Sequence, residues 1–136
     1  QAFLGVYSKH DPSELNILSS IGITPKHLPK KFPVDSDVYV KKLNSEGGEI
    51  MLTSDEYKKR ERVFYVKQNL LGRAIRVEET NVGVIILADK EGGNFSTRNS
   101  LVLHIVAGQI SAALEEAWAR EERRAREELK RKYIKI

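Results

Sequence analysis

The chain predicts an α+β fold, with a central antiparallel β-sheet of five to six strands, helices packed on it and a long C-terminal helix. Three observations support this prediction. Short apolar runs occur in two hairpin-like pairs, which is typical of antiparallel strands. Loops and short helical segments separate the two pairs. In the last third of the chain an apolar strand, a tight loop and a long helix follow one another without a break.

The elements follow one another in an order that the local residues explain. Asp11-Pro12 breaks the chain between the first two strands, and Asp35 and Asp37 are candidate N-caps for a short helix. Gly47 and Gly48 end that helix. The expected elements are strands at 2–7 and 14–20, a proline-rich irregular loop at 24–33, a helix ending at 44, a strand at 49–53, a helix from 54, a strand or buried loop at 63–66, and strands at 72–77 and 82–88.

The second strand pair leads directly into the long helix. Gly83–Leu87 is apolar throughout, so we expect a central strand covered on both faces. A glycine-rich turn follows from Asp89, Phe95 is expected to be a buried anchor, and Ser96 is the expected N-cap of the helix. The apolar stripe expected to face the sheet consists of Val102, Ile105, Val106, Gln109, Ile110 and Ala113.

The order of these residues resembles the C-terminal half of a GAF domain, a sensor module of signalling proteins. The similar run is Gly83-Val-Ile-Ile-Leu-Ala-Asp-Lys, then Gly92-Gly, Phe95-Ser and Ile105-Val-Ala-Gly-Gln-Ile-Ser-Ala-Ala-Leu-Glu. The resemblance covers residues 68–117 and is looser over residues 1–67. It implies a GAF- or PAS-like sheet and a regulatory role without catalysis. Its structural signature here is Asp89, Lys90, Phe95 and Ser96.

A cyclic-nucleotide signature of some GAF domains is only partly present. That signature reads Asn-Lys-x-Asn-Phe-x-x-x-Asp-Glu. Lys90 and the pair Asn94-Phe95 match it with one extra residue between them, but Asn99-Ser100 replaces the acidic pair. A bridge between Lys90 and a carboxylate is therefore not expected, and Lys90 is interpreted as a turn residue.

Composition excludes several kinds of chemistry. The chain has no cysteine, which excludes disulfides, thiolate zinc sites, thiol nucleophiles, cysteine-linked chromophores and the cysteine chemistry of GAF-like methionine sulfoxide reductases. His10, His27 and His104 are scattered, so no metal site or catalytic set is expected, and no cofactor is specified. No apolar run reaches the ~18–20 residues of a membrane span, so we expect a cytoplasmic protein.

The middle of the chain, residues 32–65, is the candidate ligand pocket. Its aromatic and apolar residues, together with Lys41, Lys42 and Arg60, could hold an anionic or planar ligand. The alternative is that the apolar members belong to the core and the charges form a solvated face. The candidate pocket residues are Tyr39, Leu43, Met51, Tyr57, Phe64 and Tyr65.

The tail, residues 115–136, is expected to be a dimerisation helix that follows a sensor domain at residues 1–114 and leads to an output domain. Its Glu–Arg and Glu–Lys pairs at i, i+4 spacing stabilise a helix by ~0.2–0.5 kcal/mol each. Trp118 would be costly to expose, which favours a parallel homodimer over a single solvated helix. The expected seam contains Ile110, Leu114, Trp118, Leu129 and Tyr133.

Three functional hypotheses remain open. The first is a non-catalytic sensor that binds a small effector, dimerises through the exit helix and controls a transcriptional activator, a histidine kinase or a diguanylate cyclase. The second is a structural dimerisation or docking module without a ligand. The third, less favoured because no nucleic-acid motif is present, is nucleic-acid binding through Lys26, Lys30, Lys31 and residues 58–62.

Overall fold

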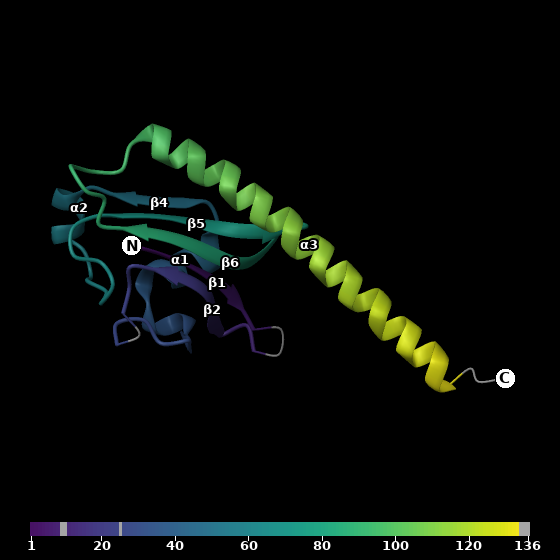
Figure 1. The fold of residues 1–136 in the computed structure, drawn as a ribbon. Coiled ribbons are helices and arrows are strands. Elements are labelled where there is room, and N and C mark those ends of the chain that lie inside the picture. Colours follow the sequence, from purple (N-terminus) through teal and green to yellow (C-terminus); the bar gives the residue numbers. More distant parts are fainter. Residues whose placement is uncertain (9–10, 25, 134–136) are drawn as a thin grey trace.

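Six strands form one antiparallel sheet in the order β3-β2-β1-β6-β5-β4 (Figure 1). The computed structural model describes residues 1–8, 11–24 and 26–133. The elements are β1 (Ala2–Tyr7), β2 (Glu14–Ile21), β3 (Lys31–Pro33), the 3₁₀ helix η1 (Val34–Ser36), α1 (Val38–Glu46), β4 (Glu49–Leu52), α2 (Ser54–Lys58), β5 (Leu70–Val77), β6 (Thr80–Ala88) and α3 (Thr97–Tyr133).

The structure confirms the predicted α+β class and the two predicted hairpins. One strand was not predicted, because β3 lies inside the proline-rich segment that was expected to be an irregular loop. It pairs with the start of β2 at the edge of the sheet, where Pro33 removes no ladder hydrogen bond from the interior. Residues 63–66, for which the sequence allows either a strand or a buried loop, form a loop. Lys9 and His10, expected in the first turn, lie outside the described residues.

The two hairpins meet where β1 pairs with β6 in the middle of the sheet. Val6 lies opposite Gly83 in this pairing. A Cβ atom at Gly83 would lie 2.3 Å from the carbonyl oxygen of Gly5, so only glycine fits there without moving a backbone. This close approach sets the distance between the two halves of the chain.

The main core lies between one face of the sheet and the segment that contains η1, α1 and the loop after α2. Asp37 caps α1 by accepting hydrogen bonds from the Tyr39 and Val40 amides, and Thr53 and Glu56 form a capping box at α2. These caps place the short helices over the strands. The largest fully buried side chains of this core are Phe3, Leu15, Val40, Leu43, Tyr57, Leu70, Val84 and Ile86.

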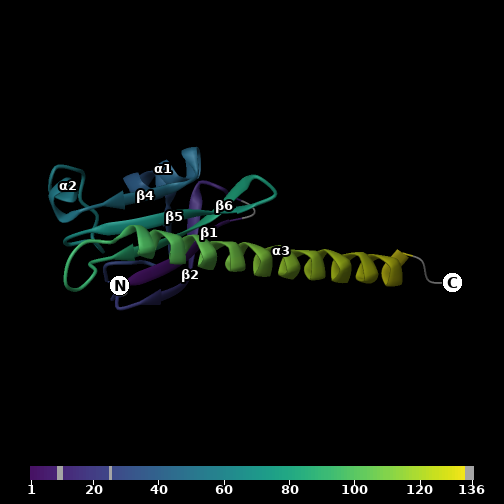
Figure 2. The same ribbon diagram turned by 90° about the horizontal axis from the view of Figure 1, so that it is seen from above.

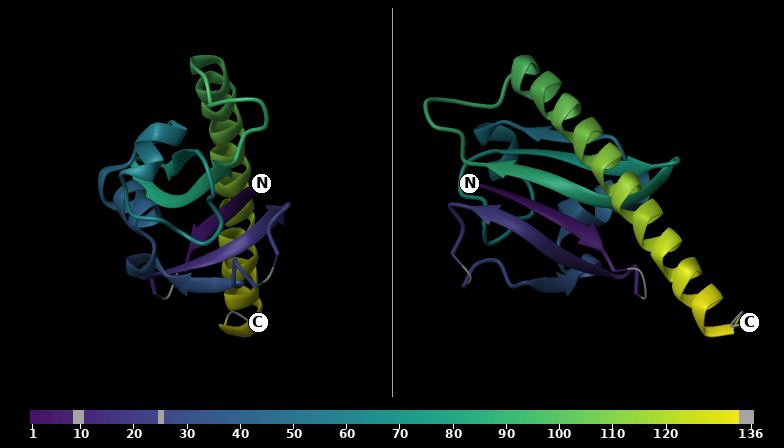
Figure 3. Two further views of the ribbon diagram at one scale, coloured as in Figure 1. Left: turned by 90° about the vertical axis from the view of Figure 1, so that its left-hand side faces the viewer. Right: turned by 45° about the vertical axis from the view of Figure 1, so that its right-hand side comes forward.

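Helix α3 covers the opposite face of the sheet, over β5 (Figure 3). The residues that it buries are Leu103 and Ala107, with Ile110 half-buried on the same side. The predicted sheet-facing stripe was therefore wrong in its rotation, because Val102 and Ile105 are exposed. The hydrogen bond from the Ser100 hydroxyl to Glu49 ties the start of α3 to β4 and fixes this rotation.

Helix α3 continues beyond the sheet as one unbroken helix (Figure 2). Two of the expected i, i+4 ion pairs are present in this part, Arg120–Glu116 at 2.9 Å and Arg126–Glu122 at 2.8 Å. The last three residues of the expected tail helix, 134–136, lie outside the described residues. Among the residues that are described, no helix combines the length and the apolarity that crossing a membrane requires.

Replacing Gly83 by alanine is expected to lower the free energy of unfolding by ~2–3 kcal/mol, because the new methyl group would press on the β1 backbone. Urea unfolding measures this change. The matched control is Gly108→Ala in α3, where an added Cβ meets open space and where alanine should leave stability equal or raise it by ~1 kcal/mol. A Gly83→Ala midpoint equal to that of the wild type would contradict the tight β1–β6 contact.

Candidate functional site

The six candidate pocket residues do not line one pocket. Leu43 and Tyr57 are fully buried in the core. Tyr39 and Met51 line one surface hollow, whereas Phe64 and Tyr65 line another. The sequence identified the right segment but could not separate residues that pack inward from those that border solvent.

Two tyrosine hydroxyls, those of Tyr39 and Tyr57, hold the loop between α2 and β5. Tyr39 donates to the Glu61 carbonyl at 2.5 Å. The Tyr57 hydroxyl donates to the Val66 carbonyl and accepts from the Val63 amide, both at 3.0 Å. Burial raises the pKa of Tyr39 to about 12 and also raises the pKa of Tyr57, so both remain neutral donors at physiological pH. These residues position the loop that forms one wall of the second hollow.

The second hollow has a volume of about 300 Å³ and combines an apolar floor with a basic rim. Its floor includes buried Leu28 and Tyr65, and its rim includes exposed Lys26 and Arg62. Phe64 lies at this rim with 86% of its surface exposed, the largest value among the exposed large hydrophobic residues described. The remaining lining residues are His27, Pro29, Phe32, Ser36, Asp37 and Val63.

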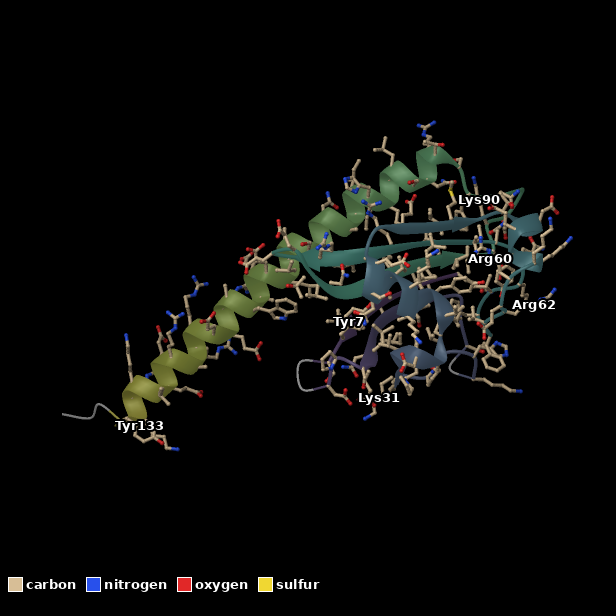
Figure 4. All side chains as sticks on the ribbon, turned by 180° about the vertical axis from the view of Figure 1, so that it is seen from behind. Tyr7, Lys31, Arg60, Arg62, Lys90 and Tyr133 are labelled. Carbon is tan, nitrogen blue, oxygen red and sulfur yellow. The ribbon has the colours of Figure 1, made fainter. Side chains whose placement is uncertain are left out.

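Arg60 and Arg62 project from the same end of the molecule, whereas Lys31 projects from another part (Figure 4). The basic residues proposed for nucleic-acid binding are all exposed, and Lys31 lies apart from Arg60 and Arg62. Lys26 and Arg62 instead border the second hollow, where they supply a local positive charge.

Asp37 is the buried carboxyl group beneath this hollow, with 4% of its surface exposed. Its Oδ1 accepts from the Tyr39 amide at 2.9 Å and the Val40 amide at 3.2 Å, and its Oδ2 accepts from the Tyr65 hydroxyl. Burial raises the pKa of Asp37, although these hydrogen bonds oppose the rise. Both carboxylate oxygens are thus committed to the protein, which makes Asp37 a positioning residue.

Tyr65 links this carboxyl group to the sheet. Its ring lies edge-on against Phe3 of β1, with the ring centroids 4.9 Å apart. Burial raises the pKa of Tyr65 well above its ordinary value, with the neighbouring Asp37 charge adding to the effect. One wall of the hollow is therefore rigidly joined to the central strand pair.

The first hollow, of about 290 Å³, has a different chemistry. It lies beside β4, and its charged residues have mixed signs: Lys42, Glu49, Glu56, Arg60 and Glu61. Met51 is 39% exposed at its edge. Because acidic and basic side chains alternate around it, this hollow is less selective for an anion than the second one, whose rim carries Lys26 and Arg62.

The corner after β6 is held by a residue that the sequence reading did not single out, Asn69. This fully buried side chain donates to the Gly93 carbonyl at 2.9 Å and accepts from the Lys90 amide at 2.9 Å. Asp89 accepts from the Lys67 and Gln68 amides at 2.9 and 2.7 Å. The glycines of the turn were visible in the sequence, but nothing local marked Asn69 as their partner.

The signature residues after Asp89 complete the same corner. The Lys90 ammonium donates to the Asn99 side-chain oxygen at 2.8 Å. The Asn99 side-chain amide therefore takes the place of the carboxylate that the cyclic-nucleotide signature would put beside this lysine. Ser96 caps α3, because its hydroxyl accepts from the Asn99 amide and its own amide donates to Asn99. Phe95 is half-buried, so it is a weaker anchor than expected.

The five expected seam residues of α3 fall into two groups. Ile110, Leu114 and Trp118 are half-buried, at spacings that put them on the same side of the helix as Leu103, and Trp118 lines a hollow on α3 with Glu121, Glu122 and Ala125. Leu129 and Tyr133 are 61% and 71% exposed on the part of α3 beyond the sheet. In the described part of the chain, no three His, Asp or Glu side chains gather as metal ligands would.

Asn69→Ala is expected to lower the free energy of unfolding by about 2–3 kcal/mol, because it leaves the buried groups of the corner without partners. Chemical denaturation measures the change. Gln68→Ala is the control, since the Gln68 side chain is exposed while its backbone amide keeps its bond to Asp89. Equal losses in the two variants would refute the role of Asn69.

Asp37 is expected to make stability depend on pH in the acidic range. Burial raises the pKa of Asp37 in the folded protein above the ordinary value of 3.8. The stabilisation that Asp37 contributes is therefore complete below pH 3.8 and is lost as the pH rises through the folded pKa. The difference in unfolding free energy between the wild type and Asp37→Asn should therefore decrease as pH is raised from 3.8. Asparagine retains the N-cap acceptor. A difference that grows with pH would contradict this assignment.

Comparison with known proteins identifies solved structures with the same architecture. No protein-family model and no curated protein matches the chain. The GAF domain of an Acinetobacter phosphoenolpyruvate-protein phosphotransferase superposes with a TM-score of 0.68 at 16% identity, covering 89% of this chain and 73% of that one. The second GAF domain of DevS from Mycobacterium smegmatis gives a TM-score of 0.66 at 15% identity, covering 89% and 83%.

A third similar structure is an enzyme, the type II free methionine-R-sulfoxide reductase of Thermoplasma acidophilum. It superposes with a TM-score of 0.66 at 12% identity, covering 85% of this chain and 78% of that one. Proteins with different roles thus share the overall fold of this chain. The chain has the fold of a GAF domain.

Proposed function

We propose that this domain is a non-catalytic regulatory sensor that binds a small effector in the hollow bordered by Lys26, Arg62 and Phe64. The single observation that carries this proposal is the combination of an exposed aromatic ring, a basic rim and an apolar floor at one place. The GAF fold supports a regulatory role in general, since two of the similar structures are GAF domains that belong to larger proteins.

The lining chemistry favours an anionic effector with a planar apolar body. Lys26 and Arg62 provide positive charge, and the Asp37 carboxyl group below them accepts hydrogen bonds from the Tyr39 and Val40 amides and the Tyr65 hydroxyl, which partly offset its negative charge. A ring of the effector can stack against Phe64, which relieves the exposure of that side chain. The volume of about 300 Å³ suits a compact ligand.

The effector signal is proposed to reach α3 through the sheet. Asp37 and Tyr65 join the hollow to α1 and to β1, and α1 packs on β5 and β6. The opposite face of β5 carries α3. A change at the hollow that shifts β5 would therefore shift the helix that leaves the domain.

The output side of the proposal rests on the length of α3. This helix extends past the sheet with exposed apolar residues, which suits a cytoplasmic homodimer that passes the signal to an output domain in the same protein. The sensor is assigned to residues 1–114 and the dimerisation helix to residues 115–136. A transcriptional activator, a histidine kinase or a diguanylate cyclase would each fit as the output domain.

A purely structural module is the second candidate. It is supported by the interior of the 32–65 segment, where Tyr39, Leu43 and Tyr57 fill the space that an enclosed ligand would need. Under this alternative the second hollow is an ordinary surface depression. The two functions therefore differ in whether the hollow binds an aromatic anion selectively.

Anilinonaphthalene sulfonate, a fluorescent aromatic anion, is the probe for this hollow, and neutral phenylnaphthylamine is its uncharged counterpart. The sulfonate should bind the folded protein more tightly than the neutral probe. Arg62→Gln should weaken its binding up to about fivefold, the value of an exposed ion pair. Phe64→Ala should weaken it about tenfold through lost stacking and burial.

Two variants are matched controls. Arg98→Gln removes an exposed arginine outside the hollow, and Met51→Ala truncates an exposed apolar side chain of the first hollow. Both should bind the probe as the wild type does, with unchanged melting temperatures. Probe binding that is insensitive to Arg62 and Phe64 would favour the structural module. Affinity for DNA at low salt that falls steeply with added salt would instead support nucleic-acid binding.

A further inference from the structure

Strand β4 forms one edge of the sheet, and its outer side pairs with no other strand of the described chain (Figure 2). Helices α1 and α2 lie beside it. Natural edge strands avoid further pairing by short length, by lysine or proline, or by a covering segment. The opposite edge strand, β3, contains Lys31 and Pro33. Strand β4 is short but contains neither lysine nor proline, so its edge is the more open of the two.

Two residues of β4 point their backbone hydrogen-bonding groups away from the sheet. The Gly48 carbonyl accepts from the Ala74 amide at 2.9 Å, which makes Gly48 part of a hydrogen-bonded pair with β5. Such pairs alternate along an antiparallel ladder, so Ile50 also bonds to β5, whereas the N–H and C=O groups of Glu49 and Met51 face outward. The exposure of Glu49 agrees with this direction, because the residue is exposed although only 24% of its side chain is. The amides and carbonyls of both residues are therefore available to a further strand.

The first hollow runs along this edge. All four residues of β4 line it, and its other walls come from α1, from α2 and from the two residues 60 and 61. Val38 of α1, which is 38% exposed, borders the hollow on the core side of the sheet, where Ile50 is buried. Met51 points to the other side, because successive side chains of a strand alternate. A strand in this hollow would therefore place alternate side chains beside Val38 and beside Met51.

We propose that the first hollow binds an extended segment of a partner protein, which adds one more antiparallel strand to the sheet beside β4. This surface differs from the effector hollow, and the inference goes beyond the proposed sensing function. In this mode of recognition, main-chain hydrogen bonds provide the binding and alternate side chains provide the selectivity. The segment recognised here has apolar side chains at every second position, directed toward Val38.

The charges around the hollow favour an acidic residue in the bound segment. Glu49 and Glu56 already accept hydrogen bonds within the chain, from a hydroxyl of α3 and from an amide of the α2 cap. The exposed charges that remain are Lys42 and Arg60 against Glu61, which leaves an excess of positive charge. Exposed ion pairs add little affinity but help to select a partner.

A single extended segment fits this hollow better than a second copy of the chain. In a second copy, β4 borders the same hollow between α1 and α2, so two copies would meet at the rims before their strands could pair. The excess positive charge of one rim would also face that of the other. An extended segment has neither obstacle.

The probe is a fluorescently labelled peptide, Glu-Thr-Val-Thr-Val-Thr, with its C-terminus amidated. When its valine side chains point toward Val38, antiparallel pairing directs its threonine amides toward β4 and its valine amides toward solvent. The peptide should bind the folded protein in a fluorescence polarisation titration. N-methylation of the first two threonines should weaken binding at least about tenfold, because it removes the bonds to β4. N-methylation of the two valines should change binding by less than about twofold.

Met51→Pro removes the outward amide from the protein, and Met51→Thr is its control, because threonine shortens the same side chain but keeps the amide. Proline should weaken peptide binding at least about fivefold relative to threonine. Circular dichroism checks that both variants are folded. The N-methylated peptides are compared on the wild type, so they decide the proposal whether or not Met51→Pro folds.

Several outcomes would overturn the proposal. They are a peptide that does not bind, equal binding of the two N-methylated peptides, and a loss on methylation of the valines alone. Equal peptide affinity of folded Met51→Pro and Met51→Thr would overturn it as well. Self-association of the wild type that Met51→Pro abolishes, without any peptide binding, would instead assign the β4 edge to a second copy of the chain. None of these outcomes bears on binding of the sulfonate probe to the second hollow.

Discussion

The pairing of β1 with β6 is the contact on which the rest of the structure depends. It joins the N-terminal hairpin to the hairpin formed late in the chain, and it occupies the centre of a six-stranded sheet. The absence of a side chain at Gly83 allows the β1 backbone to approach closely enough for a regular ladder. Without this pairing the chain would be two small hairpins, each too small to be stable alone.

Joining the two hairpins into one open sheet creates two faces that are covered by different elements. One face, under α1 and the loop after α2, carries the tyrosine-rich core and the hollow at its edge. The other carries α3 along β5 and leaves Leu101 and Ile105 of that helix exposed. The strands between the two faces physically connect the hollow to the long helix.

Buried hydrogen bonds keep the segments around the hollow in place. The Asp37–Tyr65 contact links the cap of α1 to the loop, and Asn69 locks the corner that precedes α3. Buried polar groups of this kind are costly unless every bond is made, so they favour one arrangement of these loops. They add to the apolar contacts that Leu28, Tyr65 and Val66 of the same segments make in the core.

Local sequence determined the type of element along most of the chain, because strand alternation, N-caps and glycine turns act over a few residues. It thereby predicted both hairpins, the Asp37 and Ser96 caps and the α+β class. It did not reveal the edge strand β3 or the two-residue turn at Glu78 and Glu79, whose positive φ angles normally favour Asn or Gly. Tertiary structure alone decided the strand order, the partners of Asn69, the separation of Tyr39 and Tyr57 from the second hollow and the rotation of α3. Each of these depends on contacts between residues far apart in the chain, and a helix whose residues are apolar on several sides can pack in more than one rotation.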